Sequence, residues 1–296
     1  MRYKSMNLKT QEALWGYLMI FPAITGLVVF FYITTGASLV ISFMDWDLFS
    51  PPQWVGLNNY TKLFQNENFY KSLWNTFRYA IMVVPAGQVV SLSLALALNK
   101  KIRFQKIYRL VFFLPVLTMP VAIAIVWKWI YSPAFGLSAY LSNILGAEPI
   151  KWLTDVHFAM IALVIVDIWM NSGYNMIIFL AGLQNIPKPY YEAAQIDGAN
   201  EWSQFWHITL PLLTPTIFFT LITSMITAFQ AFDLIYVMTK GGPLNSTRTL
   251  VYSIYMEGFH SFRMGYATAM SWVLLIIIFL ITLVQLKMQK RWVHYQ

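Results

Sequence analysis

The sequence contains no cysteine, and only 11% of its 296 residues are charged. The absence of cysteine excludes disulfide bonds and thiolate metal sites. Soluble domains carry about 25% charged residues, so this composition, with 58% hydrophobic residues, is not that of a soluble protein. The sequence also lacks a GxxxxGK[ST] run, the Gly-rich loop that holds nucleotide phosphates. It therefore predicts no nucleotide site of its own.

The hydrophobic residues fall in six long blocks. A bilayer core about 30 Å thick requires roughly 20 apolar residues in a helix, and lipid offers no partners for exposed backbone groups. The first block is too long for a secretory signal and lacks a small-residue cleavage site, so we expect it to remain a membrane anchor. The sequence predicts an all-α, polytopic membrane protein with six transmembrane helices, at about 13–44, 77–98, 107–131, 157–183, 210–235 and 265–286.

Lysine and arginine are distributed unevenly among the connecting segments. Twelve of the 20 lie in the two ends and the loops 99–109 and 184–209, and the other eight lie in the longer opposite loops. Because cytoplasmic loops carry the excess of positive charge, both termini are predicted to be cytoplasmic. The net charge of +8 then reflects topology rather than nucleic-acid binding. The densest group is Lys100, Lys101, Arg103, Lys106 and Arg109.

Prolines occur within or at the ends of several predicted spans, and each tends to kink its helix. A membrane tolerates such breaks where neighbours or a watery cavity satisfy the freed carbonyl, so several of them favour a transporter over a passive anchor. Tryptophans near span ends predict an aromatic belt at the headgroup level. The prolines are Pro22, Pro85, Pro115, Pro120, Pro211 and Pro215, and the tryptophans are Trp46, Trp127, Trp129 and Trp152.

The loop between the fourth and fifth blocks, 186–211, has an ordered pattern. Residues 192–197 predict a short helix, which Gly198 would end by adopting the left-handed conformation. Asn200 can cap a second helix that ends at Phe205 or His207. Two alanines permit close docking, and an acid in the first turn suits the helix dipole. We predict a rigid helix–turn–helix knob on the cytoplasmic face.

This loop also carries a resemblance to a known family. Its Glu-Ala-Ala run, the Gly three residues further on and the Ile-x-Leu-Pro run nine residues later resemble the EAA loop of binding-protein-dependent ABC importer permeases. In that family the loop forms coupling helices that sit in a groove of the ATPase subunit, and the resemblance implies this role here. The matching residues are Glu192, Ala193, Ala194, Asp197, Gly198, Ile208, Leu210 and Pro211.

Other segments extend the resemblance over nearly the whole chain. Residues 55–60 with 73–76, 241–243 with 247–250, and 265–267 resemble segments of the carbohydrate-type permeases. Together they point to the maltose-type first permease subunit. The chain differs from the enterobacterial maltose subunit because it lacks extra amino-terminal spans and the large outer insertion, so the substrate cannot be copied from maltose.

The resemblance implies an ABC importer type I permease fold, with 1–296 as one transmembrane domain in a bacterial or archaeal cytoplasmic membrane. The partners it implies are a second homologous permease subunit, two ATP-binding subunits and an extracytoplasmic solute-binding protein. ATP and Mg would be bound by the ATPase subunits, and we expect no cofactor, metal or catalytic residue on this chain. The implied substrate is an oligosaccharide or related carbohydrate, moved inward by alternating access, with glycerol phosphate as an alternative.

A polar face in the fourth block is the first candidate substrate site. Asp167, Asn171 and Tyr174 stand at i, i+4 and i+7 and share one helix face, with Asn175 adjacent. An ionisable residue within a span is a functional candidate because burial of its charge is costly. A carboxylate, an amide and an aromatic ring suit the hydroxyl and C–H groups of a sugar, although polar contacts between helices are the alternative. By resemblance, this face coincides with the sugar-contacting part of the maltose-type subunit.

The fifth block adds Ser224, Thr227 and Gln230 as candidate substrate contacts. By resemblance Ser224 falls at a pocket position, whereas Thr227 differs from the aromatic residue expected there. Asp233 and Lys128 lie at span ends, where we expect them to reach water.

Two other function classes compete with an importer subunit. An ion-coupled secondary transporter would use Asp167 as its proton or sodium site, but such folds often contain inverted repeats, and none is visible here. A membrane enzyme would need a converging group of His and acidic residues, and the sequence shows none.

Overall fold

The computed structural model describes residues 8–100 and 102–293. Residues 1–7 and 294–296, on which the predicted cytoplasmic termini depend, and Lys101 of the basic loop lie outside the described residues. The chain divides into two compact units. One is Met1–Leu63 with Glu257–Trp272, and the other is Phe64–Met256 with Val273–Gln296. Helices α3 (Asn58–Gln65) and α13 (Met264–Trp292) each begin in the first unit and end in the second.

The first unit begins with one long helix. It consists of α1 (Leu8–Leu27), a π-helical turn η1 (Val28–Ile33) and α2 (Thr34–Ser42), which follow one another without a break. A two-residue antiparallel pair, β1 (Met44–Asp45) with β2 (Gln53–Trp54), follows. The side-chain amide of Asn59 donates to the carbonyl oxygens of Ser42 and Met44 at 2.9 and 2.8 Å, so it holds the turn after α2.

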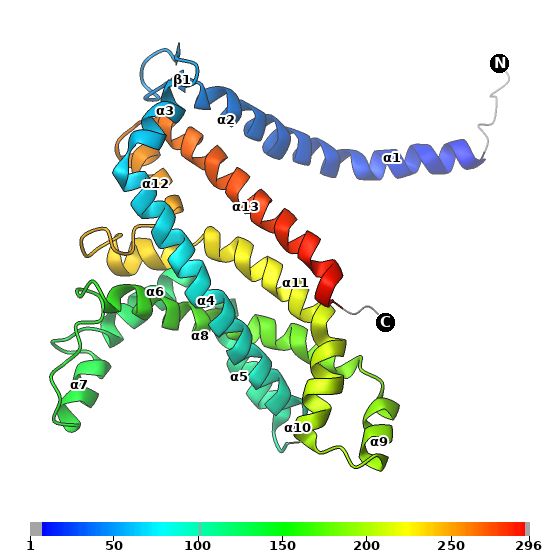
Figure 1. Cartoon of the computed structure of the whole chain (residues 1–296). Coiled ribbons are helices and arrows are strands. Elements are labelled where there is room, and N and C mark those ends of the chain that lie inside the picture. Colours follow the sequence, from blue (N-terminus) through cyan, green and yellow to red (C-terminus); the bar gives the residue numbers. More distant parts are fainter. Residues whose placement is uncertain (1–7, 101, 294–296) are drawn as a thin grey trace. The chain divides into compact units, whose positions relative to one another are not determined.

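The second unit is built on three helices, α4, α8 and α11, which pack against one another (Figure 1). Helix α4 starts where Asn66 accepts a hydrogen bond from the Asn68 amide at 2.9 Å and Glu67 places an acid in the first turn, both of which favour a helix start. The helices of this unit are α4 (Glu67–Asn99), α5 (Gln105–Leu117), α6 (Pro120–Ile130), α7 (Leu137–Ile144), α8 (Phe158–Gln184), α9 (Lys188–Ile196), α10 (Glu201–Gln204), η2 (Phe205–Thr209), α11 (Leu210–Phe229), η3 (Ile235–Thr239) and α12 (Leu250–Tyr255).

Helix α5 approaches α8 very closely at Gly173. A methyl group added at Gly173 would collide with the backbone carbonyl of Phe112. Glycine is therefore required there by the close approach of two backbones, as is common where helices pack in membranes.

The predicted third span, 107–131, is two helices rather than one. Helices α5 and α6 are bent by 100° relative to each other. The break lies at Thr118 and Met119, whose ψ angles are 142° and 128°. Pro120 explains this geometry, because its ring disfavours the helical conformation in the residue before it, while its own position at the first turn of α6 is a favourable one.

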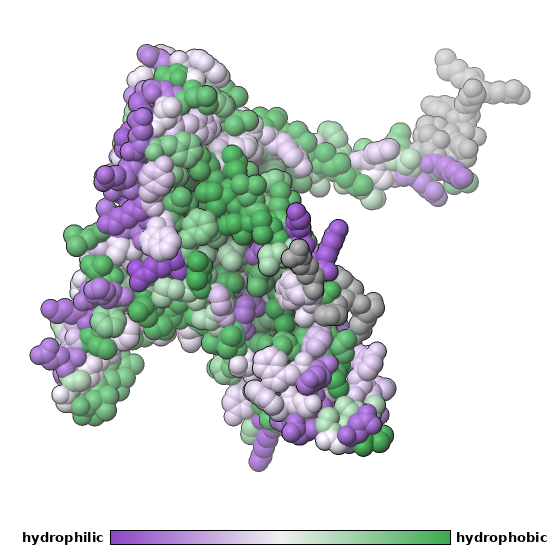
Figure 2. Space-filling view, viewed as in Figure 1, coloured by the Kyte–Doolittle hydropathy of each residue, from purple (hydrophilic) through white to green (hydrophobic). Residues whose placement is uncertain are grey.

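Five helices among residues 8–100 and 102–293 are long and apolar enough to cross a membrane, or six if α5 and α6 count as one broken span. Figure 2 shows hydrophobic residues over much of α1 and α13, with hydrophilic residues gathered where α4 begins. Except for the β1–β2 pair, the described elements are helical, which confirms the predicted all-α class.

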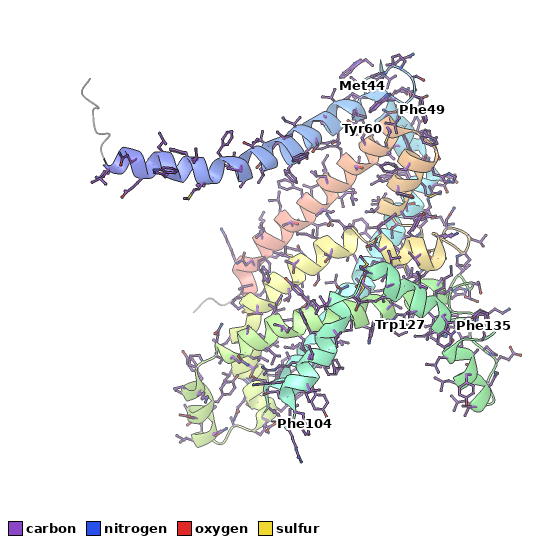
Figure 3. All side chains as sticks on the ribbon, turned by 180° about the vertical axis from the view of Figure 1, so that it is seen from behind. Met44, Phe49, Tyr60, Phe104, Trp127 and Phe135 are labelled. Atoms are coloured by element: carbon purple, nitrogen blue, oxygen red, sulfur yellow. The ribbon has the colours of Figure 1, made fainter. Side chains whose placement is uncertain are left out.

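A hydrophobic cluster fills the space between α4, α8 and α11 toward the end at which α9 lies. It packs Leu98 of α4 with Phe179 and Leu183 of α8 and Leu213 of α11, all of them buried. At the other end of the unit, Trp127 of α6 contacts the rings of Tyr131 and Trp169 (Figure 3). The hydrophobic cluster joins the three central helices below the site described next, and the aromatic contacts join α6 to α8 at the other end.

Candidate functional site

A cavity of about 560 Å³ lies within the second unit, between α4, α8 and α11. Its wall continues past the end of α11, because the helix ends at Phe229 and residues 230–232 are not helical, so the predicted fifth span does not extend unbroken to 235. All seven side chains predicted as substrate contacts line this one cavity: Asp167, Asn171, Tyr174 and Asn175 of α8, Ser224 and Thr227 of α11, and Gln230. The contact of these side chains with a substrate stays a prediction.

Asp167 is held by donors from two helices. The Tyr79 hydroxyl of α4 donates to one carboxylate oxygen, and the Asn171 side-chain amide donates to the other at 2.7 Å. Tyr79 is completely buried, whereas Asn171 is exposed to the cavity. Hydrogen bonds to an ionised group are stronger than neutral ones, so both donors stabilise the carboxylate. Asp167 thus makes the interhelical polar contact that was one interpretation of this residue, and it also faces the cavity.

A second set of hydrogen-bonded side chains is centred on Ser224. Its hydroxyl oxygen accepts from the side-chain amides of Asn175 at 3.2 Å and Gln88 at 3.3 Å. The Gln88 carbonyl oxygen in turn accepts from the Thr220 hydroxyl at 2.9 Å, which fixes the orientation of the Gln88 amide. Because the Ser224 oxygen already accepts two hydrogen bonds, the hydroxyl proton is what it offers to a ligand.

The remaining predicted residues form the open part of the wall. The Tyr174 side chain is 49% exposed, and Thr227 and Gln230 are also exposed. The Thr227 hydroxyl donates to the Thr223 carbonyl of its own helix at 2.7 Å, so it can offer only its lone pairs to a ligand. Asp233, expected from the sequence to reach water, is exposed and also lines the cavity.

The sequence analysis missed the contribution of α4. Tyr79 and Ser91 line the cavity, and Gln88 supports Ser224. The Ser91 side chain is completely buried, and its hydroxyl has no hydrogen-bond partner among the described residues. In the sequence, the only indication of a polar site on α4 was the pair Gln88 and Ser91, three residues apart in a mostly apolar stretch. This pair does not indicate which other helix packs against it.

The coupling loop, defined here as 186–211, contains two helices with a glycine between them. Helix α9 ends at Ile196, and Gly198 has a φ of +81°. The Asn200 side chain caps α10 by accepting from the Ser203 amide at 2.8 Å. The second helix was expected to end at Phe205 or His207, but it continues through η2 into α11.

Of the eight positions of this loop that match the EAA pattern, four are exposed and four are half-buried. Glu192, Ala193, Asp197 and Gly198 are exposed, Ala194 is half-buried, and Ile208, Leu210 and Pro211 lie half-buried where η2 passes into α11. The hydroxyls of Tyr191 and Thr209 lie 3.0 Å apart and connect α9 to the end of the loop.

The basic loop and the coupling loop lie at the same end of the second unit. Lys100 forms an ion pair with Glu201 at 2.9 Å, and α5 begins beside α10 (Figure 1). This placement agrees with a topology in which both loops are on one side of the membrane. Among residues 8–100 and 102–293, no three His, Asp or Glu side chains lie close enough together to hold a metal ion.

Comparison with known proteins identifies the family. Residues 87–294 match the model of the family described as binding-protein-dependent transport system inner membrane component. The chain is 42% identical to the probable ABC transporter permease protein YesP of Bacillus subtilis, over 99% of this chain and 96% of that protein. It is 35% identical to the sn-glycerol-3-phosphate transport system permease protein UgpA of Agrobacterium fabrum, over 94% of this chain and 96% of that protein.

A solved structure shows the same fold. A chain of a bacterial ABC transporter involved in the import of the acidic polysaccharide alginate superposes with a TM-score of 0.86, over 96% of this chain and 97% of that one, at 24% identity. The structure comparison shows the fold, and the sequence comparisons assign the family. The chain belongs to the binding-protein-dependent transport system inner membrane components, the permease subunits of ABC transporters.

Proposed function

We propose that this chain is a permease subunit that imports a carbohydrate, and that the cavity between α4, α8 and α11 forms its part of the substrate path. The observation that carries the proposal is the composition of the cavity wall. It presents two carboxylates, three side-chain amides, hydroxyls and the half-exposed ring of Tyr174. Sites for small molecules combine apolar surface with a few placed polar groups in this way, and a sugar offers hydroxyls and C–H faces to both.

The partners of the chain follow from the same proposal. A second, homologous permease subunit completes the substrate path, two ATP-binding subunits bind ATP and Mg, and an extracytoplasmic binding protein delivers the sugar. A family defined by dependence on a binding protein supports this set, as does the fold shared with an alginate transporter that has been solved in complex with a periplasmic protein. ATP hydrolysis then takes place on the separate subunits, and both termini of this chain are cytoplasmic.

The coupling loop transmits the motion of the ATPase. Its exposed α9 docks in the ATPase subunit, and the continuous run of α10, η2 and α11 carries displacement directly to Ser224 and Thr227 in the cavity wall. The membrane end of the loop thus reaches the proposed substrate path through one helix.

Glycerol phosphate is the second candidate substrate, because relatives that are 32–36% identical are named as sn-glycerol-3-phosphate permeases. One experiment tests the transport mechanism for both candidate substrates. Membrane vesicles containing the chain and the products of its neighbouring genes are given labelled oligosaccharides or sn-glycerol 3-phosphate. Depleting ATP while the ion gradients are kept should abolish uptake. Uptake that persists without ATP and stops when the gradients are dissipated would identify an ion-coupled transporter instead.

A further inference from the structure

The charged side chains that line the cavity are all acidic. Asp167 and Asp233 line it, and of the residues that the structure describes, no Lys, Arg or His does. Two of the three proteins compared above are named as an sn-glycerol-3-phosphate permease and a transporter involved in the import of the acidic polysaccharide alginate. An anion in this cavity would face like charges, with no compensating cation from the described residues of this chain, and in a site of reduced dielectric such repulsion is strong. The chemistry of this wall therefore differs from what an anionic substrate needs.

Asp167 is arranged to act as an acceptor for hydroxyl groups. Each of its oxygens receives one hydrogen bond from the protein, from Tyr79 and from Asn171. A carboxylate has about four acceptor positions, so each oxygen retains capacity for one further donor. Two neighbouring hydroxyls of a sugar ring are donors of the right kind. A phosphate or carboxylate oxygen has no proton to donate there.

The other polar groups of the wall also match an uncharged polyol. Ser224 has its hydroxyl proton left to donate, because two amides already occupy its oxygen. Ser91 lines the same cavity, although its hydroxyl is buried and has no partner among the described residues. A hydroxyl group can both donate to Asp167 and accept from Ser224, whereas a carboxylate or phosphate group can only accept.

We propose that this cavity selects uncharged carbohydrates and excludes sugars that carry a carboxylate or a phosphate. Asp167 is the specificity-determining residue, and Tyr79 is a positioning residue that holds its carboxylate toward the cavity. The inference rests on the proposed carbohydrate substrate and restricts that substrate to sugars without a charged group.

The test uses two forms of one sugar that differ in charge. The full chain, purified with the subunits that accompany it, is placed in lipid nanodiscs without binding protein. Binding of digalacturonic acid, its dimethyl ester and sn-glycerol 3-phosphate is then measured by ligand-observed NMR titration. The wild type should bind the ester at least about tenfold more tightly than the acid, because the acid meets the Asp167 charge at close range.

Three variants separate charge from position. Asp167→Asn keeps the shape and removes the charge, so the ratio of acid to ester dissociation constants should fall to about twofold or less. Tyr79→Phe keeps the charge and should preserve this ratio while weakening ester binding about fivefold, because the carboxylate loses one of its two anchors. Glu148→Gln removes an exposed charge outside the cavity and should change neither quantity.

The outcomes distinguish this inference from the proposed function. Equal binding of acid and ester by the wild type, or an unchanged ratio in Asp167→Asn, would overturn the charge selection and leave the carbohydrate assignment standing. Binding of sn-glycerol 3-phosphate but of neither sugar form would overturn both. The absence of binding by all three probes at millimolar concentration would likewise reject the cavity as a carbohydrate site.

Discussion

The coupling loop and the cavity lie in the same unit, but their functional side chains are held in place differently. In the coupling loop, the side chains of α9 are all at least partly exposed, and the shape comes from the Asn200 cap and the left-handed Gly198. In the cavity, Tyr79 and Gln88 reach across from α4 to Asp167 and Ser224. Local backbone conformation determines the shape of the coupling loop, whereas contacts between three helices determine where the side chains of the cavity lie. Substitutions should therefore damage them through different mechanisms.

The largest effect is expected from Gly173→Ala. The added methyl group would meet the Phe112 backbone, which cannot rotate away, so the closeness of α5 and α8 would be lost. We expect a destabilisation of about 3 kcal/mol, seen as less protein in the membrane and a lower melting temperature in detergent. Gly87→Ala is the matched control, since its methyl group would lie 4.0 Å from Ile168, an ordinary contact. Equal stability of the two variants would show that the helix spacing does not depend on Gly173.

Charge reversal in the coupling loop should separate the ATPase from the chain. Glu192 is exposed, so Glu192→Lys should leave the permease folded and weaken ATPase retention on purification about thirtyfold, as expected for a charge at a docking interface. Glu148→Lys reverses an exposed charge in another loop and should retain the ATPase. Normal retention and uptake in Glu192→Lys would contradict a coupling role for α9.

The turn of the coupling loop should be sensitive to backbone strain alone. A β-carbon at Gly198 would meet no atom within 4 Å, but the φ of +81° disfavours valine by about 1–2 kcal/mol. Gly198→Val should tilt α9 against α10 and reduce uptake about tenfold. Gly146→Val is an unusually close control, because Gly146 has a φ of +68° and equally open surroundings. If both variants transport normally, the angle between α9 and α10 is not used in coupling.

Substitutions on the open wall of the cavity should change transport without changing assembly. Tyr174→Ala removes a half-exposed ring and should reduce sugar uptake about tenfold, a loss of about 1–2 kcal/mol of contact with substrate. Tyr140→Ala removes a ring that is 63% exposed in α7 and serves as the control. Normal uptake by both Tyr174→Ala and Asp167→Asn would place the substrate contacts in the partner subunit.

The smallest effect is expected at the ion pair between the basic and coupling loops. Lys100 and Glu201 are largely exposed, with side chains 68% and 86% accessible, and such pairs contribute little. Lys100→Gln should therefore change uptake by less than about twofold. A large loss of ATPase retention in this variant would show that the basic loop takes part in docking.

The fold class and the coupling loop follow from local patterns in the sequence. The Asn200 cap and the Gly198 turn depend on residues a few positions apart, which is why they could be predicted. The bend at Met119 could not, because hydropathy remains high through Pro120 and gives one continuous block. Proline at this position was expected to kink the helix, but a direction change of 100° depends on how α5 and α6 pack against their neighbours.

For a similar reason, only the α8 and α11 residues of the cavity could be predicted from the sequence, and those of α4 could not. Helical spacing placed Asp167, Asn171 and Tyr174 on one face of α8, and this arrangement is what the structure shows. The partners on α4 depend on contacts almost ninety positions apart in the chain, from Tyr79 to Asp167. A single sequence contains no information on which helices face each other, so Tyr79 and Gln88 could not be assigned.

The hydrogen bonds from α4 have a mechanical consequence. Tyr79 fastens α4 to α8, and Gln88 fastens α4 to α11 through Ser224 and Thr220. Sliding these helices past one another would break these partly buried hydrogen bonds, and an unpaired polar group within a membrane is costly. We therefore expect the three helices of the cavity wall to resist sliding past one another. If the proposed second permease subunit completes the substrate path, we expect that path to open and close as this wall moves as one piece against the second subunit.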